Sequence, residues 1–266
     1  MYDGVQAKEK LKAYSEHFPV VELDASFYAV QPVKNYQKWV EETPDSFGFV
    51  VKTYQGMTGH DRGETSVYAN EKEMFAAFTE SIQPVVEAGK LRAVLCQFPP
   101  WFDCRKPHVD KLKRFRERLR DLPCALEFRH QSWFLPQFRE RTLSFMEEEN
   151  WIHVVCDEPQ AGEGSVPIVP KATHKDMTLV RLHGRNKEGW TFKGPNWRAV
   201  RCLYRYSEDE LQEWVFRLRE LRKQSKKVEV LFNNNSGGDA ADNAMQLIKL
   251  LGIDYEGLAP KQLGFF

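Results

Sequence analysis

The sequence alternates between short, nearly continuous apolar runs and stretches in which apolar residues recur at helical spacing. The continuous runs have the length and composition of parallel strands that are covered on both faces. Seven such runs are present: Val20–Phe27, Phe47–Tyr54, Arg92–Phe98, Cys124–Arg129, Trp151–Asp157, Thr178–Gly184 and Val228–Asn233. The pattern therefore predicts seven buried strands.

Amphipathic helices are predicted between most of these runs, with capping residues at several ends. Asn70 with Glu73, and Ser207 with Glu210, have the spacing of capping boxes, and Gly252 follows the last helical stripe as a stop signal. Strands and helices in regular alternation predict a TIM-type (β/α)8 barrel. No linker or internal repeat interrupts residues 1–266, so we expect one domain.

The strand count is one short of a complete barrel. Residues 1–10 contain no strand-like run before the first helical pattern, at about residues 6–17. Either the barrel lacks its first strand or the natural chain begins upstream of this one, and we favour the second explanation.

Composition limits the binding partners and the cellular compartment that the sequence predicts. The 38 Lys and Arg balance the 38 Asp and Glu, so an attraction for polyanions must be local. The five cysteines have no paired spacing, which disfavours a disulfide framework or a zinc motif. No apolar run approaches the roughly 18 residues of a membrane span. We expect a cytoplasmic protein that does not enter a membrane.

Candidate chemistry lies at the strand ends, where barrels of this type carry their active sites. Arg181, His183 and Arg185 alternate after an apolar run, so they are predicted to share one face of a strand. Buried cations need acids, a ligand or water. Polar residues at the other ends supply partners: Glu22, Asp24, Lys52, Gln97, Glu127, Arg129, Asp157 followed by Glu158, Asn233 and Asn234.

Each of these groups also has a structural interpretation. Glu22 and Asp24 suit a metal site or an arginine clamp, and equally a salt-bridge network with Arg129 or Arg181. A lone histidine such as His183 or His130 is more often a satisfied core residue than an acid–base group or a metal ligand. Lys52 also fits a solvated strand end.

The run that contains Asn233 and Asn234 fits either an anion-binding turn or an ordinary helix entry. No H-x-H, H-E-x-x-H or paired-cysteine motif identifies metal ligands, so the ligands are unknown, although a divalent ion stays a candidate cofactor. Nucleotide-binding and serine-hydrolase motifs are also absent.

Two long segments are predicted to cover the strand ends. Residues 159–176 connect two strands without a clear helix. Residues 186–206 interleave aromatic and basic residues, Trp190 among them, which suits either the stacking of bases between phosphate contacts or a packed lid.

Several motifs together resemble the domain-of-unknown-function 72 (YecE-like) family. The first, Val21-Glu-Leu-Asp-Ala-Ser-Phe-Tyr28, matches the family pattern V-E-x-[ND]-x-[ST]-F-Y. Others follow in the family's order: Phe49-Val-Val-Lys52, Leu95-Cys-Gln-Phe-Pro-Pro100, Glu127-Phe-Arg-His-Gln-Ser-Trp-Phe134, Arg181-Leu-His-Gly-Arg185 and Phe232-Asn-Asn234. The resemblance implies a TIM-type barrel with these motifs at one end. The family's opening G-x-[ST]-G-W segment is absent, which favours an upstream start.

Two functional hypotheses follow from these residues. The first is an enzyme for a phosphorylated or phosphodiester substrate, in which Arg181, Arg185 and Lys52 hold anionic oxygens. In it, Glu22, Glu127 or Asp157 is the base, His183 is the proton donor, and a divalent ion assists. The second is a non-catalytic module that binds nucleic acid or nucleotide through residues 186–206. A carbohydrate-processing barrel suits the arginines less well. The oligomeric state is not predicted.

Overall fold

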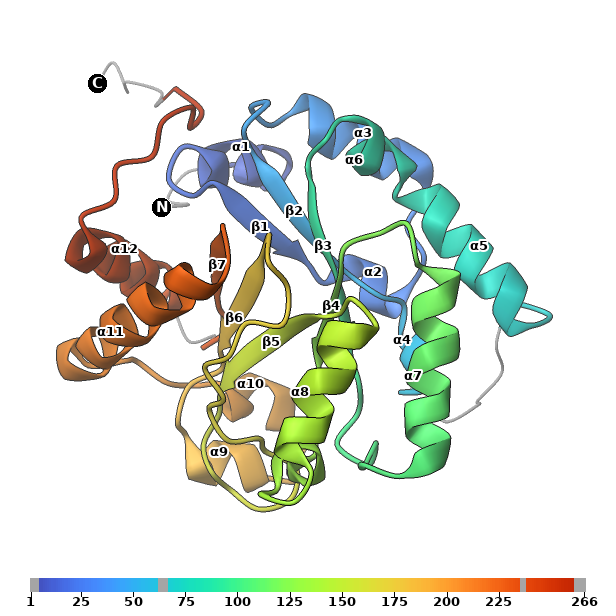
Figure 1. The fold of residues 1–266 in the computed structure, drawn as a ribbon. Coiled ribbons are helices and arrows are strands. Elements are labelled where there is room, and N and C mark those ends of the chain that lie inside the picture. The colour runs from blue at the N-terminus through green and yellow to red at the C-terminus, as the bar shows by residue number, and fades with distance from the viewer. Residues whose placement is uncertain (1–4, 62–66, 235–237, 261–266) are drawn as a thin grey trace. The chain divides into compact units, whose positions relative to one another are not determined.

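The fold is seen in a computed structural model that describes residues 5–61, 67–234 and 238–260 (Figure 1). The strands are parallel wherever their register is defined, and they follow one another in chain order, β1 to β7. Helices separate most of them along the chain. This is the topology of a TIM-type barrel with one strand fewer, as the sequence predicted.

Contacts divide the chain into two compact units, residues 1–95 with 255–266 and residues 96–254. The expectation of a single domain stays a prediction. The first unit contains β1 (Val20–Leu23), β2 (Gly48–Lys52) and most of β3 (Leu91–Gln97). Its α-helices are α1 (Lys10–Ser15), α2 (Ala25–Tyr28), α3 (Val33–Glu41), α4 (Gln55–Thr58), α5 (Glu71–Ser81) and α6 (Gln83–Glu87), and a 3-10 turn at Ala7–Glu9 precedes them.

The second unit carries the remaining strands, which lie side by side in Figure 1. They are β4 (Cys124–Glu127), β5 (Ile152–Asp157), β6 (Thr178–Leu182) and β7 (Val228–Phe232). Its α-helices are α7 (Lys106–Arg118), α8 (Arg139–Glu148), α9 (Lys187–Thr191), α10 (Trp197–Arg201), α11 (Glu208–Gln224) and α12 (Asp239–Leu251), with a 3-10 turn at Gln131–Phe134.

Burial explains the apolar runs of the sequence. Every residue of β4, β5 and β6 is buried, as expected for parallel strands covered on both faces. On one side of β6, Val180 and Leu182 pack with Trp214 and Leu218 of α11 and with Leu247 of α12. This core holds the carboxyl ends of the strands in fixed positions.

Three predicted helix ends are confirmed. Asn70 accepts a hydrogen bond from the Glu73 amide at the start of α5. Ser207 and Glu210 form a reciprocal capping box at the start of α11. Gly252 ends α12 in the left-handed conformation, with φ of 66°. The predicted absence of a helix between β5 and β6 also holds.

The first predicted strand is too long. It was expected to span Val20–Phe27, but β1 ends at Leu23 and Asp24 has helical backbone angles at the start of α2. The Ser26 hydroxyl stabilises this turn, because it lies within hydrogen-bonding distance of the Leu23 carbonyl at 2.8 Å and the Lys52 carbonyl at 2.6 Å. Glu22 and Asp24 therefore do not alternate along one strand.

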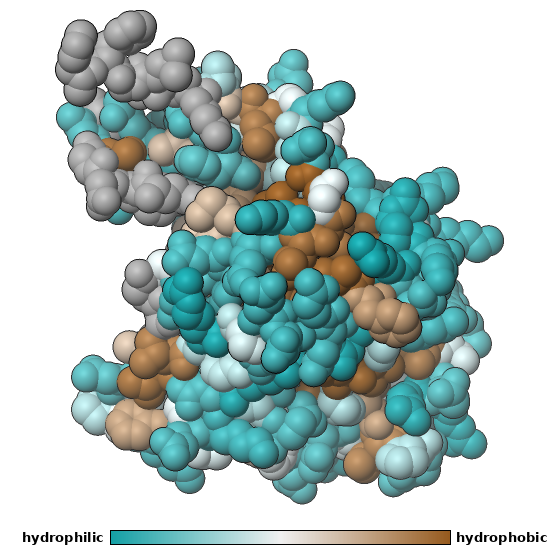
Figure 2. Space-filling model, turned by 90° about the vertical axis from the view of Figure 1, so that its left-hand side faces the viewer, coloured by the Kyte–Doolittle hydropathy of each residue, from teal (hydrophilic) through white to brown (hydrophobic). Residues whose placement is uncertain are grey.

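Within the described residues, no helix combines the length and the apolar composition that crossing a membrane requires. The face drawn in Figure 2 is mostly hydrophilic, with separate hydrophobic patches. All five cysteines are free thiols.

Candidate active site at the strand ends

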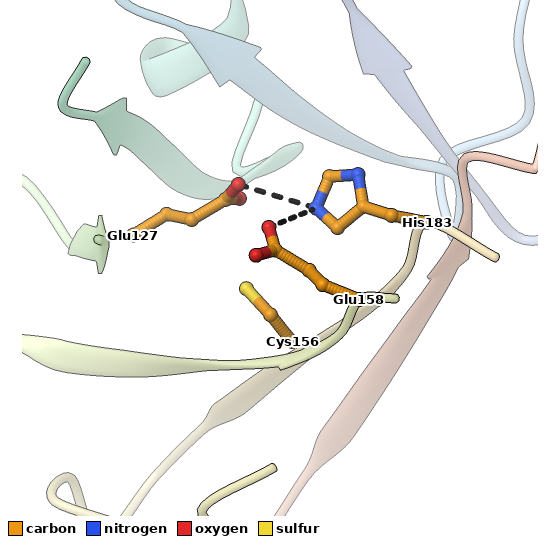
Figure 3. A group of neighbouring side chains, drawn as sticks. All are labelled: Glu127, Cys156, Glu158 and His183. Atoms are coloured by element: carbon orange, nitrogen blue, oxygen red, sulfur yellow. Dashed lines mark ion pairs between the residues drawn. The ribbon is translucent and has the colours of Figure 1, made fainter. Parts of the chain in front are cut away.

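Four side chains converge at the carboxyl ends of β4, β5 and β6 (Figure 3). Glu127 is the last residue of β4, Cys156 lies near the end of β5, and Glu158 and His183 follow β5 and β6 directly. All four are buried, and one donor atom from each lies within 4.8 Å of the others. The fold thus brings together residues that are far apart in the sequence.

Glu127 is the most strongly bound member of this cluster. Its Oε1 accepts a hydrogen bond from Gln97 Nε2 at 2.6 Å, and its Oε2 accepts one from Arg181 Nη1 at 2.6 Å. Burial by itself raises the pKa of this carboxyl, but the Arg181 guanidinium and His183 outweigh that effect and hold the pKa well below its usual range. Glu127 is therefore a fixed anion.

His183 is a neutral imidazole held at both nitrogens. Its Nε2 lies 3.2 Å from Glu127 Oε1, and its Nδ1 lies 3.0 Å from the side-chain nitrogen of Asn233. Burial, together with the nearby Arg181, lowers the pKa of His183 to about 3 despite the attraction of Glu127. At neutral pH this ring can donate or accept a hydrogen bond, or bind a metal, but it carries no charge.

Glu158 is the second carboxylate of the cluster. Its Oε2 accepts a hydrogen bond from the Val166 amide at 2.8 Å, and its Oε1 lies 2.8 Å from Arg129 Nε and 3.9 Å from His183 Nε2. Arg129 Nε is close but not aligned for a hydrogen bond, so within the described chain Oε1 is buried without one. Burial raises the pKa of Glu158 to about 7, against the effect of Arg129.

Trp190 of α9 covers this cluster between two guanidiniums. Arg129 lies 4.6 Å and Arg201 4.1 Å from its ring centroid, and its indole N–H donates to the Gly164 carbonyl. Burial and the repulsion of Arg129 lower the pKa of Arg201 to about 10. The Nε of Arg201 is buried and has no hydrogen-bond partner among the described residues.

Asp157 and Arg185 form a separate group. Arg185 Nη2 lies 2.9 Å and Nε 3.1 Å from Asp157 Oδ2, and Nη1 lies 3.0 Å from Glu210 Oε1. The Trp214 indole also donates to Asp157 at 2.7 Å. These contacts satisfy both residues, and neither joins Glu127.

The prediction that Arg181, His183 and Arg185 share one face therefore holds only in part. Arg181 and His183 both contact Glu127, but Arg185 contacts Asp157. The reason is local: β6 ends at Leu182, and Gly184 has φ of 86°, so the alternation of a strand does not continue to Arg185.

Glu22, Asp24 and Lys52 belong to the first unit, where Lys52 and Asp24 form an ion pair. Lys52 Nζ donates to Asp24 Oδ1 at 3.1 Å and lies 4.7 Å from the Phe27 ring centroid. Glu22 lies on β1, half-buried. Their functional roles stay predictions.

Asn233 and Asn234 differ in what they contact. Asn233 holds His183, whereas Asn234 is fully buried and donates to the Tyr204 carbonyl and to Asn243. Asn234 thus anchors backbone after β7. The predicted anion-binding turn that follows, residues 235–237, lies outside the described residues.

A cleft of about 480 Å³ in the second unit is lined by residues of both the cluster around Glu127 and the Asp157–Arg185 group. Glu158 and Asp157 both line it, and so do the charged residues Arg185, Lys187 and Arg217. A polar ligand therefore has a route that passes next to Glu158.

The sequence patterns did not assign Glu158, Cys156 or Arg201 a role of their own in the site, although Glu158 was named as the acid that follows Asp157. For the first two a signal was present, because alternation along β5 places residues 156 and 158 on the face opposite Asp157. Arg201 lies in the short helix α10, where the sequence showed it only as one of several basic residues between aromatic ones in the covering segment.

Comparisons with known proteins agree with the motifs. The family model "Protein of unknown function DUF72" matches residues 1–263. The UPF0759 protein YunF of Bacillus subtilis (strain 168) is 60% identical over 262 residues, which cover 98% of this chain and 93% of that protein.

Solved structures show the same fold. A DUF72 family protein of Enterococcus faecalis V583 matches with a TM-score of 0.90 and 41% identity, over 95% of this chain and 92% of that one. Another, from Thermotoga maritima MSB8, matches with a TM-score of 0.80 and 32% identity, over 94% of this chain and 92% of that one.

Proposed function

The chain belongs to the DUF72 family of proteins of unknown function, and from this premise we propose that it is an enzyme acting on a phosphorylated or phosphodiester substrate. The substrate binds where Glu127, Glu158 and His183 meet. The observation that carries the proposal is the excess of guanidinium groups around them, and above all Arg201.

The charges in this cluster favour an anionic ligand. Three guanidiniums, those of Arg129, Arg181 and Arg201, surround two carboxylates. Arg181 pairs with Glu127, and Arg129 pairs with Glu158 at 2.8 Å and more distantly with Glu127 at 3.9 Å. Arg201 instead packs on Trp190, and among the described residues its buried Nε–H has no acceptor. Arg201 as a whole is half-buried, and a buried N–H without an acceptor costs about 1–3 kcal/mol. A phosphoryl group supplies both the charge and the acceptor oxygens, and guanidinium is well suited to it.

The chemistry is assigned to the groups beside these cations. Oxygens of Glu127 and Glu158 and a nitrogen of His183 converge on one point, where a water can be positioned and activated for attack on phosphorus. Asp157, which Arg185 and Trp214 hold, has a structural role in this proposal.

Binding is tested first with inorganic phosphate and p-nitrophenyl phosphate, by thermal unfolding and by titration calorimetry. Arg201→Gln removes the unmatched cation, and we expect a 10- to 100-fold loss of affinity, from the roughly 1.5–3 kcal/mol of a charge-assisted hydrogen bond. Arg205→Gln is the matched control, because Arg205 is exposed and pairs with Asp239 and Asp242. Equal binding by wild type and Arg201→Gln contradicts the proposal.

Turnover is tested with p-nitrophenyl phosphate and bis(p-nitrophenyl) phosphate. Glu127→Gln should abolish hydrolysis of whichever ester is cleaved, and Arg205→Gln should not. If hydrolysis persists at the wild-type rate in Glu127→Gln and in Arg201→Gln, the site lies elsewhere.

A second function, binding of single-stranded nucleic acid without chemistry, has one supporting observation. Phe192 and Trp197 remain 48% and 39% exposed on the covering segment, whereas Trp190 is buried and not available to stack on bases. Salt-sensitive binding of a labelled oligonucleotide, weakened by Trp197→Ala, is the expected result. Binding that Trp197→Ala leaves unchanged argues against it.

We expect the protein to act in the cytoplasm, since none of its five cysteines, all of which lie in the described part of the chain, forms a disulfide. An anionic small molecule is the partner that the buried cluster favours.

A further inference from the structure

We propose that the cluster at the strand ends is also a metal site, where one zinc-type divalent ion is bound by Glu127, Cys156, Glu158 and His183. This metal site deepens the proposed function. Only the catalytic role of the ion rests on that function. The binding of the ion itself stands on the geometry of these four side chains.

The separations between the donor atoms are close to those around a tetrahedral ion. Zinc binds nitrogen, oxygen and sulfur at about 2.0–2.3 Å, so neighbouring ligand atoms lie roughly 3.3–3.8 Å apart. His183 Nε2 lies 3.2 Å from Glu127 Oε1 and 3.9 Å from Glu158 Oε1, close to this range. Cys156 Sγ lies within 4.8 Å of the other three donor atoms, so the thiol needs to move by about 1 Å at most.

Outer contacts already orient both carboxylates. Arg181 holds Oε2 of Glu127, and the Val166 amide holds Oε2 of Glu158. The Oε1 atom of each carboxylate is left facing His183 (Figure 3). Metal ligands are commonly fixed in this way by hydrogen bonds from groups that do not touch the ion.

The Oε1 atom of Glu158 gives an independent indication of a ligand. It is buried, directed at His183 Nε2, and without an aligned hydrogen bond in the described part of the chain. A buried carboxylate oxygen normally has such a partner. A metal ion at this point supplies the missing interaction.

Asn233 can hold His183 in the orientation that a metal requires. A ligand histidine usually donates its second ring N–H to an acceptor. The amide of Asn233 lies 3.0 Å from His183 Nδ1, and a half-turn of that amide places its oxygen there. The proton then sits on Nδ1, and Nε2 is free to bind the ion.

The charges are compatible with a cation despite the arginines. A coordinating thiol releases its proton to solvent and binds as thiolate. The thiolate and the two carboxylates then offset all but one of the positive charges on the ion, Arg129 and Arg181. The one positive charge that remains adds to the charge of Arg201. An anionic substrate compensates this combined positive charge. Thiolate and imidazole favour zinc, cobalt or iron over magnesium or calcium.

Cobalt(II) is the probe, because its spectrum reports the ligands. Full-length, metal-free chain is titrated with cobalt(II) chloride and followed by visible and near-ultraviolet absorption, with bound metal counted by mass spectrometry after dialysis. We expect one ion per chain, tetrahedral ligand-field bands and a thiolate-to-cobalt charge-transfer band. Cys156→Ser should lose the charge-transfer band, while Cys104→Ser, a cysteine outside the cluster, should keep it.

Ligand variants complete the test. Glu158→Gln and His183→Gln should each weaken cobalt binding more than tenfold. Circular dichroism of each variant establishes that it is folded, and the wild-type spectrum decides the question independently of any variant. Absence of bound cobalt, or bound cobalt with no charge-transfer band, overturns the four-ligand site.

The two proposals fail in different ways. Stoichiometric cobalt binding without hydrolysis of any phosphate ester leaves the metal site standing and removes the proposed activity. Hydrolysis that is unchanged in metal-free protein removes the catalytic role of the ion, and absence of bound cobalt together with that hydrolysis removes the metal site while leaving the proposed activity standing.

Discussion

Glu127 and Arg181 form a buried ion pair whose contribution to stability can be measured by a double-mutant cycle. The single changes are Glu127→Gln and Arg181→Met, and the third variant combines them. The two side chains are 0% and 1% exposed, and their nearest atoms lie 2.6 Å apart. Each single change removes the nearest opposite charge from a side chain that stays buried, although Arg129 remains 3.9 Å from Glu127.

The expected magnitude follows from this burial. At about 4 Å between charge centres and an effective dielectric constant near 20, the attraction is about 4 kcal/mol. Removing one partner of a buried pair typically costs about 3–5 kcal/mol, so each single variant should lose that much free energy of unfolding. The double variant should lose less than the sum of the two, by at least about 2 kcal/mol, because no unpaired charge of this pair remains.

The assay is urea-induced unfolding of metal-free protein at neutral pH, followed by tryptophan fluorescence and circular dichroism. Coincident transitions in the two signals justify a single free energy of unfolding. Lys106 and Asp110 provide the control, since their ion pair spans 3.1 Å but their side chains are 87% and 44% exposed. That pair should show a coupling below about 0.5 kcal/mol. Additive losses for Glu127 and Arg181 would refute the reasoning.

Three further predictions concern other parts of the chain. Burial lowers the pKa of His153 from 6.5 to about 4, so as the pH falls the unfolded chain binds this proton before the folded chain does. Relative to His153→Gln, the wild type should therefore lose about 3 kcal/mol of unfolding free energy between pH 6.5 and pH 4. A stability difference between the two proteins that stays constant in urea titrations across this pH range contradicts the prediction. Gly184→Ala should lower the unfolding free energy by about 2–4 kcal/mol, because φ is 86° and the new Cβ would lie 2.5 Å from Tyr204 Cβ. Gly89→Ala, at φ of 66° with open space around it, should cost only about 1 kcal/mol in the same urea assay; equal losses would exclude a role for Tyr204. Asp157→Asn should cost about 2–3 kcal/mol by weakening the hold on Arg185, and a loss under about 0.5 kcal/mol would show that Glu210 suffices.

Most of the fold could be predicted from local patterns. Strands such as β5 are recognisable because a parallel strand buried on both faces has to be apolar along its whole length. The starts of α5 and α11 are recognisable because a capping side chain bonds a backbone amide only three residues away. The end of β1 was placed wrongly because Ser26 bonds the Lys52 carbonyl, 26 residues distant.

The site was only partly predictable, and β5 shows why. The acidic pair at the end of this strand, Asp157 and Glu158, was visible in the sequence, but periodicity does not say which of the two acids meets Glu127. Glu158 does, since it follows Cys156 on that face, while Asp157 contacts Arg185 and Trp214. Partners from other strands make this distinction, and they lie far away along the chain.

The sequence by itself determined which segments become strands and helices, their parallel order, and the presence of charged groups at the strand ends. These properties depend on neighbours within a few residues. Only the tertiary structure decided that Glu127, Glu158 and His183 share a buried point while Arg185 turns to Asp157. That outcome depends on where each strand stops and on the left-handed turn at Gly184. It also depends on which side chains the neighbouring strands bring alongside, and no local pattern carries this information.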